Sequence, residues 1–166
     1  GNPLAGATVH ATDGTQTATT DASGVYHLNY VPAGTHPVVA DKHGYTPVTQ
    51  NVTVTEGNTV TQNFTLALLP QVTVTGHVVA NTAPTVGIQG ATINLTGYEP
   101  YSGTTNASGD FSITGVFANQ TYNYTVAATG FQPTTGQVVV GSTNVNMGTL
   151  MVTEVMFPAS QVVATD

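Results

Sequence analysis

The chain has 166 residues, and it lacks cysteine, tryptophan and arginine; its one lysine is Lys42. Without cysteine there are no disulfides, thiol nucleophiles or cysteine metal ligands. Lysine and arginine neutralise phosphates in nucleic acids and in anionic lipid surfaces, so their near absence argues against nucleic-acid binding and against a polybasic membrane patch. No run of 18 apolar residues occurs, and we therefore predict no membrane span.

Charge is scarce in the whole sequence, whereas β-branched residues are abundant. Charged residues make up 5% of the chain, against about 25% in ordinary globular domains, and the net charge is -7. Threonine occurs 32 times and valine 24 times, and both favour strands over helices. With 40% hydrophobic residues for a core, and with 18 glycines and nine prolines for turns, the composition predicts an all-β protein.

The two halves of the chain repeat each other in order, at an offset of 84–86 residues. The matched pairs are LAGATVHAT (Leu4–Thr12) with IQGATINLT (Ile88–Thr96), TTDASGVYHL (Thr19–Leu28) with TTNASGDFSI (Thr104–Ile113), ADKHGYTPVT (Ala40–Thr49) with AATGFQPTT (Ala127–Thr135), and NVTVTEG (Asn51–Gly57) with QVVVG (Gln137–Gly141). Short alternating runs between closely spaced turn signals predict tandem immunoglobulin-like β-sandwiches. We place the two domains at residues 1–69 and 70–153, and a surplus C-terminal strand at 154–166.

DASG and NASGD have the residues of tight turns between strands, and we predict a hairpin turn at each. Asp21 and Asn106 can accept hydrogen bonds from backbone two residues on, and Gly24 and Gly109 can adopt positive φ.

Period-two alternation predicts which side chains face the core after these turns. In the first repeat they are Tyr26, Leu28 and Tyr30, and in the second Phe111, Ile113 and Phe117. The next strand contributes Val52 and Val54 in one repeat and Val138 and Val140 in the other.

PLAGATV, TTDASGVYHLNYVPAG and GYTP together resemble the carboxypeptidase regulatory-like domain, which is grouped with transthyretin-like and Cna B-type sandwiches. The resemblance covers both repeats. It implies β-sandwich modules that serve as stalks, spacers or adhesive segments of extracellular proteins. Cna B-type domains often carry a Lys–Asn isopeptide crosslink, but Lys42 lies in the DKHGY corner and not in an early core strand, so we expect no such bond.

In the family that the chain resembles, another strand precedes PLAGATV. The second repeat has this strand as VTVTGHVVAN (Val72–Asn81), whereas the sequence opens at the turn before the first PLAGATV. The tail SQVVATD (Ser160–Asp166) matches GHVVAN (Gly76–Asn81) at Val-Val-Ala. We therefore expect that domain 1 lacks its first strand and that the tail is a copy of that strand.

A tail at the far end of one molecule is well placed to fill the gap of the next, as in donor-strand complementation. This predicts a structural subunit of an extracellular or cell-surface, pilus-like filament, whose partner is a second copy of the chain. The predicted donor residues are Met156, Phe157, Val162, Val163 and Ala164, and the predicted acceptor residues are Leu4, Ala7 and Val9. Two alternatives stay open: a segment of a longer covalent repeat array, and an ordinary two-domain monomer.

Signals for other chemistry are few. The five histidines lack metal-ligand spacing and no catalytic motif occurs, so we predict no enzyme, no cofactor and no metal site. The close pair Tyr98 and Tyr101 is the basis of an alternative reading, a carbohydrate-binding stalk or adhesin segment. Six N-x-[ST] sequons are candidates for glycosylation: Asn51, Asn63, Asn94, Asn106, Asn119 and Asn123.

Overall fold

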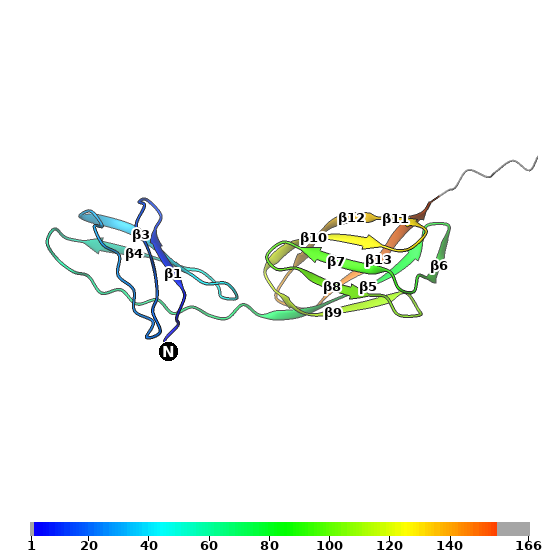
Figure 1. Ribbon diagram of the computed structural model, residues 1–166, viewed down its shortest axis with the longest axis horizontal. Helices are drawn as coiled ribbons and strands as arrows, with labels where there is room; N and C mark the ends of the chain where they lie inside the picture. Colours follow the sequence, from blue (N-terminus) through cyan, green and yellow to red (C-terminus); the bar gives the residue numbers. More distant parts are fainter. Residues whose placement is uncertain (1, 156–166) are drawn as a thin grey trace, which may run out of the picture. The chain divides into compact units, whose positions relative to one another are not determined.

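The computed structural model describes residues 2–155, and within that range it contains strands and no helix. This confirms the predicted all-β class. The chain divides into two compact units, Gly1–Leu69 and Pro70–Asp166, which are described separately below (Figure 1). In the part of the chain that the structure describes, no helix is long and apolar enough to cross a membrane.

The first unit contains one antiparallel sheet with the strand order β2-β1-β3-β4. Its strands are β1 (Thr8–Ala11), β2 (Thr17–Thr19), β3 (Gly34–Asp41) and β4 (Val48–Val54). One face of this sheet carries the buried core of the unit, formed by Val9, Val38, Ala40 and Val52. Tyr26, Leu28, Val54, Phe64 and Leu66 pack against that core from partly exposed positions.

The second unit contains two sheets. The strands of the first are β7 (Thr92–Thr96), β8 (Tyr101–Thr104), β10 (Gln120–Ala127) and β12 (Thr134–Val140), in the order β12-β10-β7-β8. The second sheet comprises β5 (Gln71–Ala80), β6 (Ala83–Gly87), β9 (Asp110–Phe117), β11 (Phe131–Gln132) and β13 (Val145–Glu154). Val74 and Phe111 from one sheet share a buried core with Ile93 and Tyr122 from the other, as the predicted sandwich requires.

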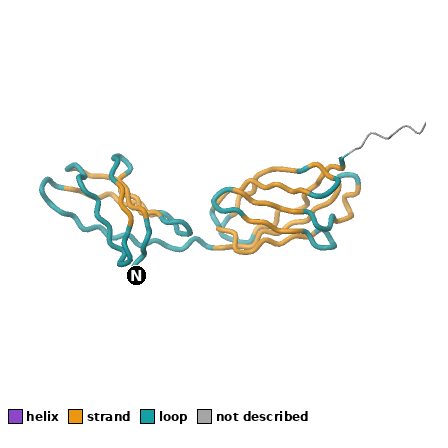
Figure 2. Tube along the Cα trace, in the orientation of Figure 1, coloured by secondary structure: helices purple, strands orange, loops and turns teal. Residues whose placement is uncertain are grey.

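The sheet of the first unit is the repeat counterpart of β12-β10-β7-β8, and it has the same antiparallel pairings. The counterpart of the other sheet is mostly loop, as Figure 2 shows in teal. Residues 25–30 align with β9 and residues 59–68 with β13. Among the described residues, their only sheet pairing is an isolated bridge between Tyr45 and Leu68.

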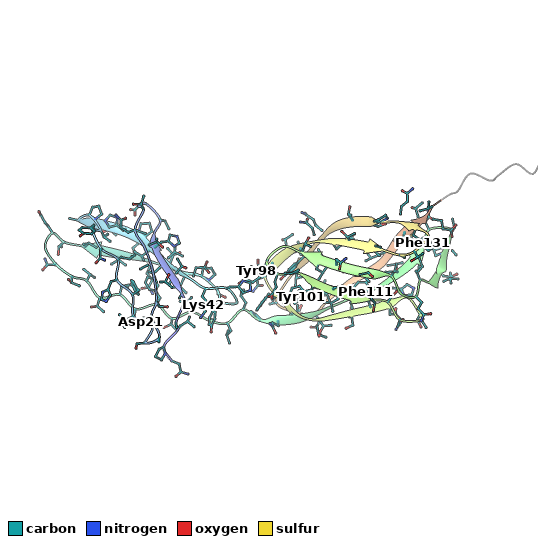
Figure 3. The ribbon with its side chains drawn as sticks, in the orientation of Figure 1. Asp21, Lys42, Tyr98, Tyr101, Phe111 and Phe131 are labelled. Atoms are coloured by element: carbon teal, nitrogen blue, oxygen red, sulfur yellow. The ribbon has the colours of Figure 1, made fainter. Side chains whose placement is uncertain are left out.

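The DASG and NASGD turns form with the predicted side-chain hydrogen bonds. Asp21 (labelled in Figure 3) accepts bonds from the backbone N–H groups of Ser23 and Val25 at 2.8 and 2.9 Å. The side-chain oxygen of Asn106 likewise accepts bonds from the backbone N–H groups of Ser108 and Asp110, at 2.9 and 3.0 Å. The expected hairpin is wrong in both units. In the second unit this turn joins β8 to β9, which belong to different sheets, and in the first unit the residues that follow the turn, 25–30, form no strand.

The prediction that Tyr30 faces the core is wrong, because Tyr30 is 95% exposed. Its φ of 60° is left-handed, and this breaks the two-residue alternation that keeps Tyr26 and Leu28 against the core. The repeat has Gly115 at the corresponding position, with a φ of 74°. In the second unit Gly115 lies inside β9, which continues to Phe117 across a register shift in its pairing with β5. After this glycine the buried residue is Val116, whereas the predicted core residue Phe117 is only partly buried.

Candidate functional site

β5 is the central strand of its sheet in the second unit. It pairs antiparallel with β9 on one side and parallel with β13 on the other. The inward side chains Val74 and Val78 are fully buried. β5 thus supplies backbone partners for two strands and closes the apolar interior of this sandwich.

The first unit has a groove of about 770 Å³ where the repeat alignment places a counterpart of β5. Its walls include Tyr26 from the segment aligned with β9, and Phe64 and Leu66 from the segment aligned with β13. The full lining is Asn2, Pro3, Leu4, Ala7, Val9, Thr20, Ser23, Gly24, Tyr26, Ala40, Tyr45, Gln62, Asn63, Phe64, Thr65, Leu66 and Leu68. A sheet face and two extended segments with little sheet pairing therefore surround this space.

The three predicted acceptor residues all line the groove. Ala7 and Val9 are 3% and 1% exposed, and Leu4 is half-buried. The structure brings them to one site, and their role in subunit contact stays a prediction. The predicted donor residues Met156, Phe157, Val162, Val163 and Ala164 lie outside the described residues.

A threonine fixes the chain before β1. The hydroxyl of Thr20 accepts a hydrogen bond from the N–H of Ala7 at 2.9 Å and donates one to the carbonyl of Leu4 at 2.6 Å. The second unit repeats this arrangement: Thr105 accepts from the N–H of Ala91 at 2.9 Å and donates to the carbonyl of Ile88 at 2.5 Å. The acceptor residues are therefore held in place by a feature that both repeats share.

A hydrogen bond connects the two walls of the groove. The Tyr26 hydroxyl donates to the carbonyl oxygen of Gln62 at 2.9 Å. The Tyr26 ring also packs against Phe64, with 6.2 Å between ring centroids. Burial raises the pKa of Tyr26 above the ordinary tyrosine value, which already lies well above neutral pH, so the hydroxyl is a donor throughout the physiological range. The sequence alone placed Tyr26 in the core but gave no sign of its partner.

Tyr98 and Tyr101 lie near one end of the second unit, where Figure 3 labels them. Both are half-buried, and each ring contacts an aromatic ring of its own unit edge-on, Tyr98 on Phe117 at 5.5 Å and Tyr101 on Tyr122 at 5.8 Å. The Tyr101 hydroxyl also accepts a hydrogen bond from the N–H of Phe117 at 3.2 Å. These contacts make the pair part of the packing, and they give no support to a carbohydrate-stacking platform.

All six sequon asparagines are exposed. Asn51, Asn94 and Asn123 lie on outward faces of β4, β7 and β10. Asn106 uses its side-chain oxygen to hold its turn, and Asn123 accepts a hydrogen bond from Gln137 at 2.9 Å. Exposure makes glycan attachment sterically feasible, and attachment itself stays a prediction.

The DKHGY corner places Lys42 beside the start of the chain. Its Nζ donates a hydrogen bond to the carbonyl of Ala5 and lies 5.9 Å from the centroid of the Tyr45 ring. These contacts tie the corner to the segment before β1. Among residues 2–155, no group of three or more histidine, aspartate or glutamate side chains is arranged to hold a metal ion.

Comparison with known proteins agrees with this architecture. A minor pilin of Streptococcus agalactiae aligns with a TM-score of 0.52 at 14% identity, over 98% of this chain and 89% of its own. A streptococcal ancillary pilin aligns with a TM-score of 0.56 at 17% identity, over 90% of this chain and 57% of its own. At such identities the likeness shows the fold alone. No curated protein matches the sequence. The model of the carboxypeptidase regulatory-like domain matches residues 1–67 and again residues 73–151, and the chain therefore belongs to that family, with two copies of the domain.

Proposed function

We propose that this protein is a structural subunit of an extracellular, pilus-like fibre, in which the C-terminal strand of one copy fills the groove of the next. The observation that carries the proposal is the position of the groove. In the second unit the corresponding place is taken by β5, whereas in the first unit the described residues leave a groove of about 770 Å³.

The tail has the residues that such a groove needs. Its Val162, Val163 and Ala164 repeat Val78, Val79 and Ala80 of β5, which are 0%, 0% and 6% exposed in the second unit. A strand that adds to two unpaired edges gains main-chain hydrogen bonds from both and covers the apolar interior between them. The tail of a second copy is therefore a chemically matched occupant.

The geometry of this contact favours a chain of subunits. Tail and groove are different surfaces, so each bound copy still presents a free tail or a free groove for the next. Such a contact propagates into a filament unless a rotation closes it into a ring. The pilin fold of the two aligned structures agrees with a fibre on the cell surface, and the sequons are candidate glycan sites on that fibre.

A strand preceding residue 1 in a longer polypeptide would fill the same groove in cis. The protein would then be a stalk or adhesin segment of a cell-surface repeat array. The two functions differ in the covalent mass of the repeating unit. Mass spectrometry of the native material should give about 17.0 kDa plus any glycans if the protein is a separate subunit. It should give a much larger mass if the chain is one segment of a covalent array.

Removal of the tail tests the proposed function. A chain that ends at Glu154 keeps all the described strands but has no donor strand. We expect the full chain to form fibres in electron micrographs and the shortened chain to sediment as a monomer. An added peptide of residues 156–166 should also stop the growth of full-length chains, because it occupies the grooves. Fibres of normal length from the shortened chain would refute the proposal.

A further inference from the structure

The repeat alignment also specifies how the tail lies in the groove, and this inference rests on the proposed function. We infer that the donor strand runs antiparallel to residues 25–30 and parallel to residues 59–68, with Gln161 opposite Val25 and Val162 turned toward the core. This assigns a direction, a register and an inward face to the subunit contact.

The pairing of β5 with β9 defines one side of this arrangement. His77 lies opposite Asp110, and Thr75 lies opposite Ser112, in an antiparallel ladder. The His77 Nδ1 and an Asp110 carboxylate oxygen are 2.8 Å apart, so directly opposed side chains meet on the outer face. In the repeat alignment, Gln161 of the tail corresponds to His77 of β5, and Ala159 corresponds to Thr75.

The counterparts on the groove wall are available for this pairing. Val25 replaces Asp110 and His27 replaces Ser112 in the first repeat. Both residues are exposed, while Tyr26 and Leu28 point toward the core, so the segment already has the alternation of a paired strand. Gln161 should therefore lie opposite Val25, and Ala159 opposite His27.

The pairing of β5 with β13 defines the other side. In that parallel ladder Leu150 lies beside Val78 and Val152 beside Ala80. Phe64 and Leu66 replace Leu150 and Val152 in the first repeat, and both line the groove.

On this side Val162 lies beside Phe64, and Ala164 lies beside Leu66. Both pairings belong to the one strand β5 and reach the tail through one alignment, so they give the tail a single direction and a single inward face.

One position of the tail requires a rearrangement. A Cβ built on Gly76 would lie 2.7 Å from two ring atoms of Phe111 and 3.2 Å from the carbonyl oxygen of Gly148. The tail has Ser160 at this position, Tyr26 replaces Phe111, and Gln62 replaces Gly148. Ser160 therefore displaces the Tyr26 ring, and its hydroxyl comes within hydrogen-bonding reach of the Gln62 carbonyl that Tyr26 releases.

The absence of cysteine makes the register directly measurable, because every disulfide then reports an introduced pair. Two matched double variants are Val25→Cys with Gln161→Cys, and His27→Cys with Ala159→Cys. The mismatched controls exchange partners: His27→Cys with Gln161→Cys, and Val25→Cys with Ala159→Cys. Fibres are grown under reducing conditions, oxidised, and run on a non-reducing gel.

We expect both matched variants to give ladders of covalent multimers, at least about tenfold more abundant than in the controls, because directly opposed Cβ atoms are close enough for a disulfide and positions shifted by two residues are not. Fibres without matched ladders, or with stronger mismatched ones, overturn the register and leave the proposed function intact. Failure of the unsubstituted chain to form fibres overturns the proposed function itself. A crosslinked monomer overturns the contact between copies.

Discussion

The Tyr26 hydroxyl and the Gln62 carbonyl oxygen, 2.9 Å apart, join the two walls of the groove in the first unit. In the second unit the corresponding residues Phe111 and Gly148 both adjoin β5 at Gly76. In the first unit, therefore, a side chain links the two walls at the place where β5 lies between the corresponding residues of the second unit.

Replacing Tyr26 by phenylalanine removes this hydrogen bond and keeps the ring. In a chain that ends at Glu154, we expect the free energy of unfolding of the first unit to fall by about 1 kcal/mol, which is typical of one hydrogen bond. In the proposed filled groove Ser160 takes over the Gln62 carbonyl, so the substitution removes a hydrogen bond from the empty groove only. A peptide of residues 154–166 should therefore bind the variant about fivefold more tightly. Denaturant unfolding and calorimetric titration measure the two effects.

Tyr30 provides the matched control for this variant. Its residue is 95% exposed, and Tyr30→Phe should change neither the unfolding free energy nor the peptide affinity. Weaker peptide binding by Tyr26→Phe would show that the Tyr26 hydroxyl contributes to the filled groove, contrary to the proposed exchange.

A charge on the inward face of the tail should abolish assembly, whereas the same charge on its outward face should not. Val162→Asp places a carboxylate at the position of Val78, which is fully buried in the second unit. Gln161→Asp places it at the position of His77, which is partly exposed. Turbidity and electron microscopy should find no fibres for the first variant and normal fibres for the second. Equal assembly of the two would contradict the predicted inward face.

The Thr20 hydroxyl should contribute measurably to the stability of the first unit. Thr20→Val leaves the Ala7 N–H and the Leu4 carbonyl without this partner, and we expect a loss of about 1–3 kcal/mol in the free energy of unfolding. Thr17→Val, at an exposed position of β2, is the control and should change stability by less than about 0.5 kcal/mol. Similar losses from both variants would argue against a specific role for Thr20.

Much of the fold followed from local patterns. The repeats, and the alternation of Val52 with its polar neighbours Asn51 and Thr53, predicted strands and core positions correctly, because a buried face imposes a period of two. The oxygen of Asp21 bonds the N–H two residues on, as its type and spacing predict. These features depend on a few adjacent residues.

The predictions that failed concern features that neighbouring residues in the sequence do not determine. Nothing near Tyr30 reports its left-handed φ, and the turn at Asn106 has the same composition whether its strands share a sheet or not. Leu4, Ala7 and Val9, which the repeat singled out, all line the groove, and their role as acceptor residues stays a prediction. The wall residue Gln62 was missed, because its carbonyl is recognised by Tyr26 from a distant segment.

The stability of the first unit should depend on pH through His36. Its Nδ1 lies 3.0 Å from an Asp13 carboxylate oxygen and its Nε2 lies 2.9 Å from the Pro32 carbonyl oxygen. Only the protonated ring donates to both acceptors, so the bond to Asp13 and then the one to Pro32 raise the pKa of His36. A group with a raised pKa in the folded state stabilises the fold while it is protonated.

This contribution is complete below the unfolded pKa of about 6.5 and is lost as the pH rises through the raised pKa of folded His36. The melting temperature of the first unit should therefore fall between mildly acidic and mildly alkaline pH. Asp13→Asn removes the larger cause of the shift and should flatten this dependence, and NMR titration of the His36 ring should show its midpoint moving downward. A melting temperature with the same pH slope in both proteins would rule out His36 as the responsible group.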